Sequence, residues 1–324
     1  MSLMRSFDEQ YIDLCRRILA EGEKVQNYRG VDNRSGVVAS AIPDHTSQRA
    51  SGAKTIRLPH QVMQFDLSQE FPILTSKKVG WKSAVIEILW IFQAASNEVK
   101  WLQDRGVHIW DEWEISATGE YQGRNLNQIF RERHPNEPEE DFAGTIGTAY
   151  GWIVKKYGLI DNLIETLRSN PGNRRMVLSL WQNEWLETAA LPSCVWNSQW
   201  NVTDERLNVL VTSRSTDTPL GLPYNVVQYA VLSHLIAQVT GFKPGILTFI
   251  TNDAHIYENQ IEGIKEQIAR YDQAVTSGSL PKAPKLWVNP EIKEFADFDN
   301  SKDLKDIRLE GYEHLGVIKM PVTE

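Results

Sequence analysis

Cysteine and long apolar segments are scarce in this sequence. Only two cysteines, Cys15 and Cys194, occur in 324 residues, which is too few for a disulfide scaffold and favours a reducing, cytoplasmic setting. No apolar run reaches the roughly 18 residues that a membrane-spanning helix needs, and no apolar segment of a signal peptide follows the first residues. No cluster of Cys and His has the spacing of a zinc site. We therefore expect a cytoplasmic protein that uses no metal.

Positive charge is also in deficit. The chain carries 34 Lys and Arg against 42 Asp and Glu, a formal net charge of -8. This balance argues against a general nucleic-acid-binding surface, because such a surface needs clustered Lys and Arg. It still permits a small basic pocket for one phosphate group. The remaining composition is that of an ordinary globular protein, with 41% hydrophobic residues, and a chain of this length can bury a sizeable core.

The order of the predicted elements favours one mixed domain. Strand-like and helix-like segments mix without strict alternation, which is typical of an α/β (mixed α+β) single domain over residues 1–324. Residues 27–54 are polar and rich in Gly, Ser and Ala, so we expect a long mobile loop, and the charged residues 115–145 are expected to form a surface insertion. A second methionine at Met4 suggests that residues 1–3 are a cloning remnant. The patterns predict helices at 7–21, 82–103, 160–169, 226–239 and 256–271, and strands at 56–65, 176–181, 198–202, 207–212, 247–251, 286–288 and 307–309.

The residues most suggestive of chemistry surround Cys194. A cysteine alone is more often a packing residue, as we expect for Cys15 on the apolar face of the first helix. Arg214 follows Cys194 by one predicted strand pair, and Arg174-Arg175 precede the first of these strands. Antiparallel strands can bring these arginines beside the thiol, where positive charge would stabilise the nucleophilic thiolate. Three guanidinium groups would also suit a phosphate monoester, although Arg174 and Arg175 could equally form a solvated basic edge.

Five motifs occur in an order that resembles the thymidylate synthase family. They are Phe71-Pro72-Ile73-Leu74-Thr75, Ile109-Trp110-Asp111-Glu112-Trp113, Leu191-Pro192-Ser193-Cys194, the run from Arg214 to Asn225, and Asn252-Asp253-Ala254-His255-Ile256-Tyr257. The resemblance implies the fold of that family, a single domain whose large bent mixed sheet forms the interface of a homodimer. It also implies methylation of dUMP at carbon 5, with 5,10-methylenetetrahydrofolate as co-substrate, to give dTMP and dihydrofolate.

The resemblance further assigns roles to single residues. Cys194 would add to carbon 6 of the pyrimidine and make carbon 5 a nucleophile. Glu87 would move protons at the base through ordered water, and Tyr150 would help to remove the carbon 5 proton. The amide of Asn225 would face O4 and N3 of uracil. The nucleotide phosphate would be held by Arg49, Arg214 and Ser215 and, from the opposite subunit, by Arg174 and Arg175. The sugar hydroxyl would be bound by His255 and Tyr257. The folate would be bound by Asp217, Trp110 and Gly221.

The sequence departs from the family pattern at several positions. Val195 stands where many members carry histidine, and Ser213 replaces a common glutamine. The end of the chain, Thr323-Glu324, differs from the small apolar residue that usually folds over the folate, so the exclusion of water is in question. Arg34 and Arg49 both match the Arg-Thr-Gly phosphate loop of the family. We favour Arg49 because it lies closer to the strand that follows.

Two other functions stay open at this level. A dUMP or dCMP hydroxymethylase of the same superfamily would share the Cys194 adduct, but water would attack the methylene group in place of hydride. The departure at Val195 and the altered tail favour that wetter site. A catalytically silent homologue that binds nucleotide or RNA would not need the full set of reactive residues, and the acidic net charge does not support RNA binding.

Taken singly, several of these residues have simpler explanations. Asn225 could cap a helix that begins after Pro223, because asparagine is a good N-cap residue. His255 could lie at the N-terminus of the helix predicted at 256–271. Glu87 could be a paired glutamate at the edge of an apolar helix. Their joint occurrence in one order favours the catalytic interpretation.

Overall fold

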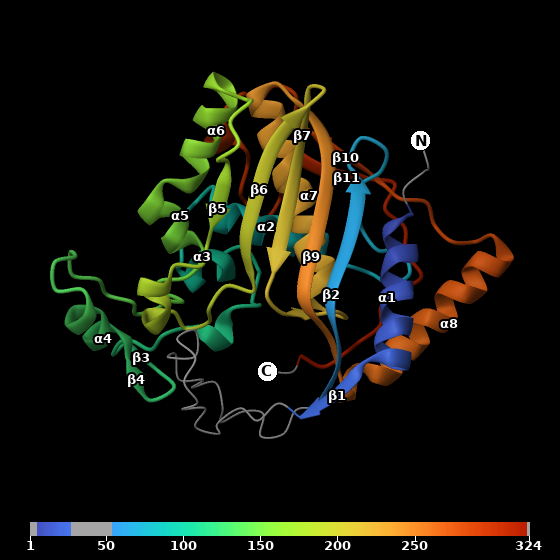
Figure 1. The fold of residues 1–324 in the computed structure, drawn as a ribbon, viewed down its shortest axis with the longest axis horizontal. Helices are drawn as coiled ribbons and strands as arrows, with labels where there is room; N and C mark the ends of the chain where they lie inside the picture. Colours follow the sequence, from blue (N-terminus) through green and yellow to red (C-terminus); the bar gives the residue numbers. More distant parts are fainter. Residues whose placement is uncertain (1–4, 27–53, 323–324) are drawn as a thin grey trace.

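A seven-stranded mixed sheet forms the centre of the protein (Figure 1). The computed structural model describes residues 5–26 and 54–322. The strand order is β1-β2-β9-β7-β6-β5, and β8 extends the sheet beside β9. β7 and β8 run parallel to β9, and all other neighbours are antiparallel. The strands are β1 (Glu23–Gln26), β2 (Lys54–Asp66), β5 (Val177–Ser179), β6 (Val195–Thr203), β7 (Arg206–Ser213), β8 (Thr216–Asp217) and β9 (Lys243–Tyr257), with separate pairs β3 (Glu120–Tyr121) and β4 (Arg124–Asn125), and β10 (Lys285–Val288) and β11 (Ile307–Glu310).

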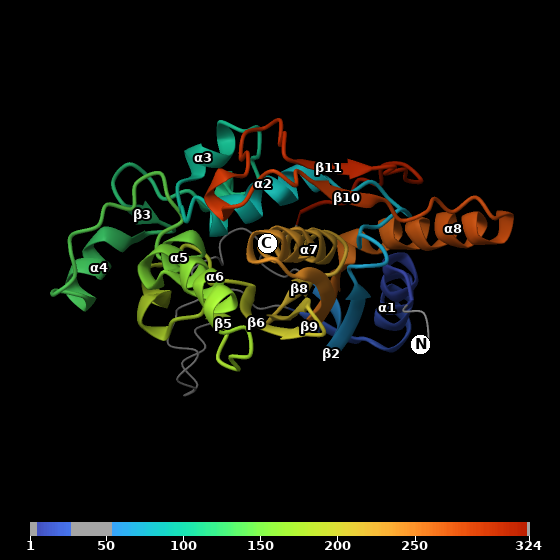
Figure 2. The same ribbon diagram turned by 90° about the horizontal axis from the view of Figure 1, so that it is seen from above.

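One face of the sheet is covered by two stacked helices. Helix α7 packs on β7 and β9, and α2 packs on the other side of α7 (Figure 2). Because α7 is enclosed by the sheet and α2, it is buried on nearly all sides, and its sequence is apolar around the whole circumference. The helices are α1 (Phe7–Glu21), α2 (Trp81–Phe92), α3 (Val99–Gln103), α4 (Leu126–Arg133), α5 (Gly151–Tyr157), α6 (Leu159–Ser169), α7 (Gly221–Thr240) and α8 (Ile261–Ser277).

The opposite face of the sheet carries no helix of the described part of the chain and points toward the viewer in Figure 1. One row of cross-strand neighbours on this face consists of Gln64, Thr248, Leu210, Gln199 and Val177. Val177 is 48% exposed, and Val62, on the same face, is 59% exposed. The face is therefore partly apolar and open.

The pairing of β2 with β9 keeps one register along its whole length. Pro59 lies opposite Asp253 and Gln61 opposite Thr251, so one residue on each strand, His60 and Asn252, stands between these two pairs. His60 has a φ of 53°, which is uncommon for a residue with a side chain. Beyond this point β9 also pairs with β8, through Ala254 and His255, where the candidate site lies.

Most of the predicted elements are confirmed, including the mixed α/β class. α1 matches the predicted range 7–21, because Ser6 and Glu9 form a capping box at its start and the helix ends before Gly22. The predicted insertion at 115–145 contains β3, β4 and α4, and its residues Phe130 and Phe142 are buried, so it packs onto the core in addition to covering surface. The loop predicted at 27–54 lies outside the described residues, except for Lys54, the first residue of β2.

Several predicted boundaries are wrong. The helix predicted at 82–103 is two helices, α2 and α3, because the chain turns at Ala95 (φ 44°) and Asn97 then donates to the carbonyl of Gly147 at 2.8 Å. The strand predicted at 247–251 continues to Tyr257, so α8 begins only at Ile261.

The predicted start of α7 is also wrong. This helix begins at Gly221, five residues before the prediction, and Pro223 lies in its first turn. A proline is tolerated there because the first backbone N–H groups of a helix have no partner within it. Asn225 is therefore inside the helix and is not its N-cap.

Candidate active site

Cys194 lies immediately before β6, half-buried, with its backbone anchored by an aromatic hydroxyl. The backbone N–H of Cys194 donates to the hydroxyl of Tyr150 at 3.0 Å. Its carbonyl oxygen accepts from the backbone N–H of Arg214 at 2.9 Å and from the hydroxyl of Ser213 at 3.2 Å. Ser213 therefore holds the cysteine backbone. The strand ends thus fix the thiol while leaving it accessible.

A guanidinium group lies beside the thiol. Arg214 Nη2 is 3.7 Å from Cys194 Sγ. The same group donates to the carbonyl of Pro192 at 2.9 Å, and Nε donates to the carbonyl of Ser193 at 3.1 Å. The guanidinium carbon also lies 5.7 Å from the ring centre of Trp181. These contacts hold the guanidinium group next to the sulfur of Cys194.

Glu87 is a buried carboxylate on α2 with two defined donors. The indole N–H of Trp110 donates to Oε1 at 2.8 Å, and the amide of Gln228 donates to Oε2 at 2.6 Å. Burial raises the pKa of Glu87 to about 7, although both hydrogen bonds act to lower it. A carboxyl group with such a pKa can accept and release a proton near neutral pH.

Gln228 also connects Glu87 to Asn225. Asn225 Nδ2 donates to Gln228 Oε1 at 3.0 Å, one turn earlier on α7. Gln228 was not among the site residues predicted from the sequence. The available signal was a single amide within the apolar run 226–232, three residues after a residue with an expected role in binding the base.

Tyr150 occupies a strained backbone conformation. Its φ of 46° and ψ of -106° are unusual for a residue with a side chain. The following residue must be glycine, because a Cβ on Gly151 would lie 2.0 Å from the carbonyl oxygen of Ser96. The ring of Tyr150 packs edge-on against Trp110, with centroids 5.3 Å apart. Burial, and then the nearby Cys194, raise the pKa of the Tyr150 hydroxyl well above its usual value, so the hydroxyl is neutral at physiological pH.

Asp217 lies on β8 and is held from two sides. Oδ1 accepts from the backbone N–H of Leu220 at 2.8 Å, and Oδ2 accepts from Gln260 Nε2 at 2.9 Å. Gly221 leaves space here, since a Cβ at this position would be 3.8 Å from the Asp217 Cβ and 4.0 Å from Asn225 Oδ1. The predicted folate-binding and base-binding residues are therefore neighbours across Gly221.

Two further polar residues near Asp217 were not predicted. Lys77 is 5% exposed and donates to the carbonyl of Pro219; burial lowers its pKa to about 8, while Cys15 and Asp217 act in the opposite direction. Gln260 is fully buried and donates to the carbonyl of Pro321 at 3.2 Å as well as to Asp217.

The C-terminal segment therefore reaches this side of the site. A Cβ at Gly263 would lie 2.8 Å from Met320 Cγ, so Met320 packs directly on α8. Thr323 and Glu324 lie outside the described residues, as do Arg34 and Arg49.

His255 and Tyr257 belong to the end of β9. His255 pairs with Asp217 in the register between β9 and β8, and its Nδ1 is 3.4 Å from Asp253 Oδ1. The two rings meet edge-on with centroids 5.1 Å apart. Because β9 continues through both residues, His255 does not occupy a helix N-terminus.

Arg174 and Arg175 are exposed and lie at the far end of β5 from Cys194. Val177 is opposite Gln199, which is five residues from Cys194 along β6. At about 3.3 Å per residue, the two arginines are more than roughly 16 Å from the thiol of their own chain. The expectation that strand pairing brings them beside Cys194 within one chain is therefore wrong.

The environments of Cys15 and Val195 differ from that of Cys194. Cys15 is fully buried on α1, and burial raises its pKa to about 12, as expected for a packing thiol. Val195, the residue that replaces the common histidine, is 3% exposed within β6.

Among residues 5–26 and 54–322, no group of three or more His, Cys, Asp or Glu side chains could hold a metal ion. Nor does this part of the chain contain a helix long and apolar enough to cross a membrane.

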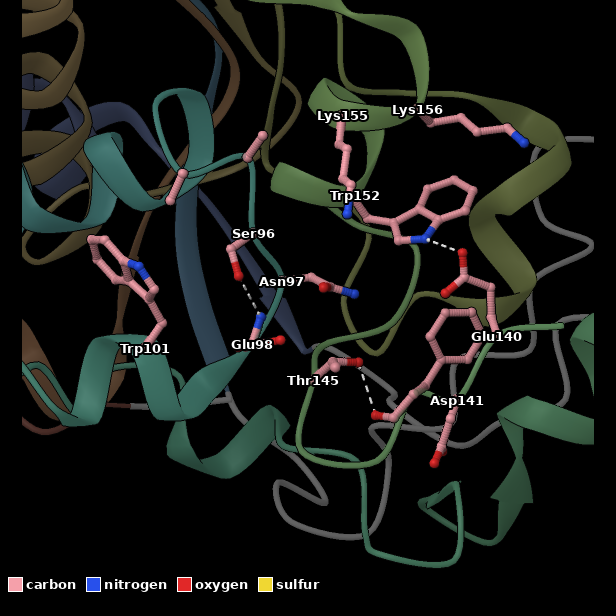
Figure 3. Close-up of a pocket in the computed structure, with 13 residues that line it drawn as sticks. Ser96, Asn97, Glu98, Trp101, Glu140, Asp141, Thr145, Trp152, Lys155 and Lys156 are labelled. Carbon is pink, nitrogen blue, oxygen red and sulfur yellow. Dashed lines mark hydrogen bonds between the residues drawn. The ribbon is translucent and has the colours of Figure 1, made fainter. Parts of the chain in front are cut away.

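A cavity of about 500 Å³ lies away from the thiol, between the end of α2, the segment 140–145 and α5 (Figure 3). Several of its polar groups bond to one another: Trp152 Nε1 donates to Glu140 at 3.3 Å, and the Thr145 hydroxyl donates to the carbonyl of Phe142 at 2.8 Å. None of the predicted site residues lines this cavity.

Comparisons with known proteins agree with the motifs. The sequence matches the thymidylate synthase family over residues 9–324. Thymidylate synthase of Clostridium beijerinckii is 49% identical over 320 residues, which cover 99% of this chain and 100% of the relative. Thymidylate synthase 1 of Bacillus subtilis is 36% identical, with 96% of each chain covered. The solved structure of thermostable thymidylate synthase A from Bacillus subtilis matches with a TM-score of 0.72 at 33% identity, again with 96% of each chain covered. The chain therefore belongs to the thymidylate synthase family.

Proposed function

We propose that this enzyme methylates dUMP at carbon 5 with 5,10-methylenetetrahydrofolate, producing dTMP and dihydrofolate. The observation that carries the proposal is the position of Arg214, whose guanidinium group is 3.7 Å from the sulfur of Cys194. A cysteine sulfur beside a fixed cation is well placed to act as the nucleophile. Family membership supplies the substrate class, and the arrangement around the thiol supports the same chemistry.

The first bond forms between Cys194 Sγ and carbon 6 of the pyrimidine. The electron pair of the 5,6 double bond then makes carbon 5 nucleophilic, and carbon 5 attacks the methylene carbon of the folate. Carbon 5 next loses its proton, and the carbon–nitrogen bond to the folate breaks. Hydride from the folate reduces the resulting exocyclic methylene, and the thiolate leaves carbon 6. Atoms balance because the folate supplies both the carbon and the hydride.

Glu87 and Tyr150 are proposed to handle protons in this sequence. Glu87 can exchange a proton near neutral pH, since burial raises its pKa to about 7. Tyr150 anchors the backbone of Cys194 and touches Trp110, so its hydroxyl lies between the nucleophile and the aromatic wall. A neutral hydroxyl there can guide water toward the carbon 5 proton without adding a negative charge.

The nucleotide is proposed to lie along the strand ends that surround Cys194. Asn225 faces the base, and Arg214 with Ser215 binds the phosphate. Arg49, which lies outside the described residues, is proposed to bind it too, and Arg34 is the alternative. His255 and Tyr257 bind the sugar hydroxyl. Support comes from the register of β8 with β9, which pairs His255 with Asp217, and from the edge-on contact between the rings of His255 and Tyr257.

The folate is proposed to contact Asp217, Trp110 and Gly221. A carboxylate can accept hydrogen bonds from the amine and ring N–H of a pterin. Gly221 has no side chain beside Asp217 and Asn225, which supports close approach of a flat ring there. The C-terminal segment, which reaches Gln260 through the carbonyl of Pro321, is placed to cover this side of the pocket and limit entry of water.

A homodimer is proposed to complete the site. The open sheet face with the exposed side chains of Val62 and Val177 is partly apolar, and the same face of a second copy is proposed to cover it. Arg174 and Arg175 lie far from their own thiol at the edge of this face. Their exposed guanidinium groups are therefore proposed to reach the phosphate bound by the partner subunit.

The test of this function is adduct and product analysis. With dUMP and the folate, mass spectrometry should show dTMP, and absorbance should show dihydrofolate. With 5-fluoro-dUMP and the folate, intact-protein mass spectrometry should show a covalent complex, because fluorine cannot leave as a proton does. Cys194→Ala should abolish both results, whereas the matched variant Cys15→Ala should retain both.

Two outcomes would contradict the proposal. An adduct that persists in Cys194→Ala would exclude this nucleophile. A product heavier than dTMP by one oxygen, without dihydrofolate, would identify a hydroxymethylase, the function that the buried valine at position 195 would favour.

A further inference from the structure

Gln228 is a buried amide placed between two site residues of different kinds. It is 3% exposed and lies on α7, one turn after Asn225. Its Nε2 donates to Glu87 Oε2 at 2.6 Å, and its Oε1 accepts from Asn225 Nδ2 at 3.0 Å. One side chain thus connects a carboxylate to the amide that faces the base.

The direction of this chain of hydrogen bonds follows from the chemistry of its first member. An ionised Glu87 can only accept, so Gln228 must present its NH₂ group to it. The carbonyl oxygen of Gln228 then faces Asn225 and can only accept in turn. Asn225 must therefore direct Nδ2 toward Gln228. Each amide could flip in isolation, but the carboxylate determines both orientations.

This direction determines what Asn225 offers to a pyrimidine. Its second Nδ2 hydrogen and its Oδ1 remain free, so it presents a donor beside an acceptor. Uracil presents an acceptor at O4 and a donor at N3, which is the complementary pattern. Cytosine presents the reverse pattern and needs a flipped Asn225. A flipped Asn225 would place its Oδ1 against Gln228 Oε1. If Gln228 also turned, its Oε1 would instead face an oxygen of the Glu87 carboxylate.

We propose that Gln228 is a positioning residue that locks the amide of Asn225 in the orientation that accepts uracil and rejects cytosine nucleotides. The inference rests on the proposed function, because it assumes that Asn225 faces the base. The inference adds to that function the residue that determines which base is accepted. Gln228 itself touches other side chains and need not touch the substrate.

The lock depends on the charge of Glu87. A protonated Glu87 could donate to Gln228 Oε1 and so support the flipped arrangement. The titratable groups that face Glu87 are the hydroxyls of Tyr150 and Tyr224, and its remaining polar neighbours are Trp110 and Gln228. Burial raises the pKa values of both tyrosines, so they remain neutral. Glu87 alone titrates near neutrality, with a pKa raised by burial to about 7.

The experiment compares dUMP and dCMP binding in Gln228→Met and a matched control. Methionine has nearly the shape of glutamine but neither donates nor accepts in the required way. The control is Gln238→Met on the same helix, where the amide donates to the carbonyls of Asn289 and Ile292 at 2.8 and 3.0 Å, outside the site. Titration calorimetry without folate measures the Kd of each nucleotide separately from the chemistry.

The expected result is a change in the ratio of the two Kd values. In Gln228→Met the preference for dUMP over dCMP should fall about tenfold, the effect of removing one buried polar contact. Gln238→Met should keep the wild-type ratio within about twofold. A general loss of packing would weaken both nucleotides together and leave the ratio unchanged. A Gln228→Met protein that folds and keeps the wild-type ratio would refute the inference.

A second measurement uses the wild type alone and does not depend on the variant folding. The dUMP preference should decrease several-fold from about pH 8 to about pH 6, as Glu87 takes up a proton. Titration of the nucleotide phosphate is common to both ligands and cancels in the ratio. A preference that is constant over this pH range, or a wild type that binds dCMP as well as dUMP, would overturn the inferred role of Gln228. Failure of the proposed function would look different, since the wild type would then not convert dUMP to dTMP.

Discussion

Replacing Glu87 with glutamine should change how the stability of the protein depends on pH. The variant Glu87→Gln keeps the shape of the side chain but removes a buried ionisable group. Burial raises the pKa of Glu87 from 4.5 to about 7 in the folded protein. Folding therefore favours the protonated carboxyl, and this contribution to stability is fully present below about pH 4.5. It is lost as the pH rises through about 7.

The size of the effect follows from the pKa shift. A change from 4.5 to about 7 corresponds to roughly 3 kcal/mol in the free energy of unfolding. Wild-type stability should thus decrease by up to this amount between about pH 5 and about pH 8 through Glu87 alone. In Glu87→Gln that component disappears. The variant should be relatively more stable above neutral pH, although it loses turnover.

The assay is urea unfolding at fixed protein concentration at several pH values. The wild type, Glu87→Gln and the control Glu165→Gln are compared, where Glu165 is an exposed carboxylate on α6. The difference between wild type and Glu87→Gln should grow with pH, and the control should follow the wild type. Parallel curves for wild type and Glu87→Gln would show that Glu87 does not titrate with a raised pKa, and would refute the reasoning.

Two further predictions concern assembly and the backbone at Tyr150. Mixing inactive Cys194→Ala with inactive Arg174→Ala subunits should restore activity, since one site per heterodimer would be intact; no recovery after confirmed subunit exchange would place Arg174 in its own chain's site. Gly151→Ala should destabilise the protein by at least about 2 kcal/mol, because the new Cβ would lie 2.0 Å from the Ser96 carbonyl oxygen. Gly172→Ala, with its nearest atom at 4.0 Å, should change the unfolding free energy by less than about 0.5 kcal/mol.

Sequence patterns predicted the fold best where local periodicity and burial agree. The helix at 7–21 has an apolar face and its own capping residues, so its limits are encoded locally. The end of β9 is different. Residues 252–256 alternate poorly, and their extended conformation depends on pairing with β2 and β8, which are distant in sequence. A local pattern cannot report such pairing, and the prediction placed a helix there too early.

The candidate site shows the same difference between what local sequence patterns reveal and what depends on contacts between distant residues. Motifs identified the residues expected to touch substrate, and the structure brings Cys194, Arg214 and Glu87 into one region with Asn225 and Asp217. Sequence reasoning failed for Arg174 and Arg175 within one chain, because strand pairing was inferred without its register. It also missed residues that act on other residues. No chemical property distinguishes Gln228 from a polar residue at a helix edge until its two partners are known.

The two carboxylates of the site are held in the same way, and this explains why neutral amides matter there. Glu87 is bonded to Gln228 and Asp217 to Gln260, and both glutamines are buried. A carboxylate only accepts, whereas an amide accepts on one side and donates on the other.

Each glutamine can therefore satisfy a carboxylate and at the same time accept from a second group. For Gln228 that group is Asn225, and for Gln260 it is the backbone N–H of Tyr257 at 3.1 Å. Each carboxylate, as a hydrogen-bond acceptor, thus determines an orientation one residue away, at Asn225 on one side of the pocket and at the end of β9 on the other. A change of either carboxylate to a donor should therefore disturb substrate contacts that it does not itself make.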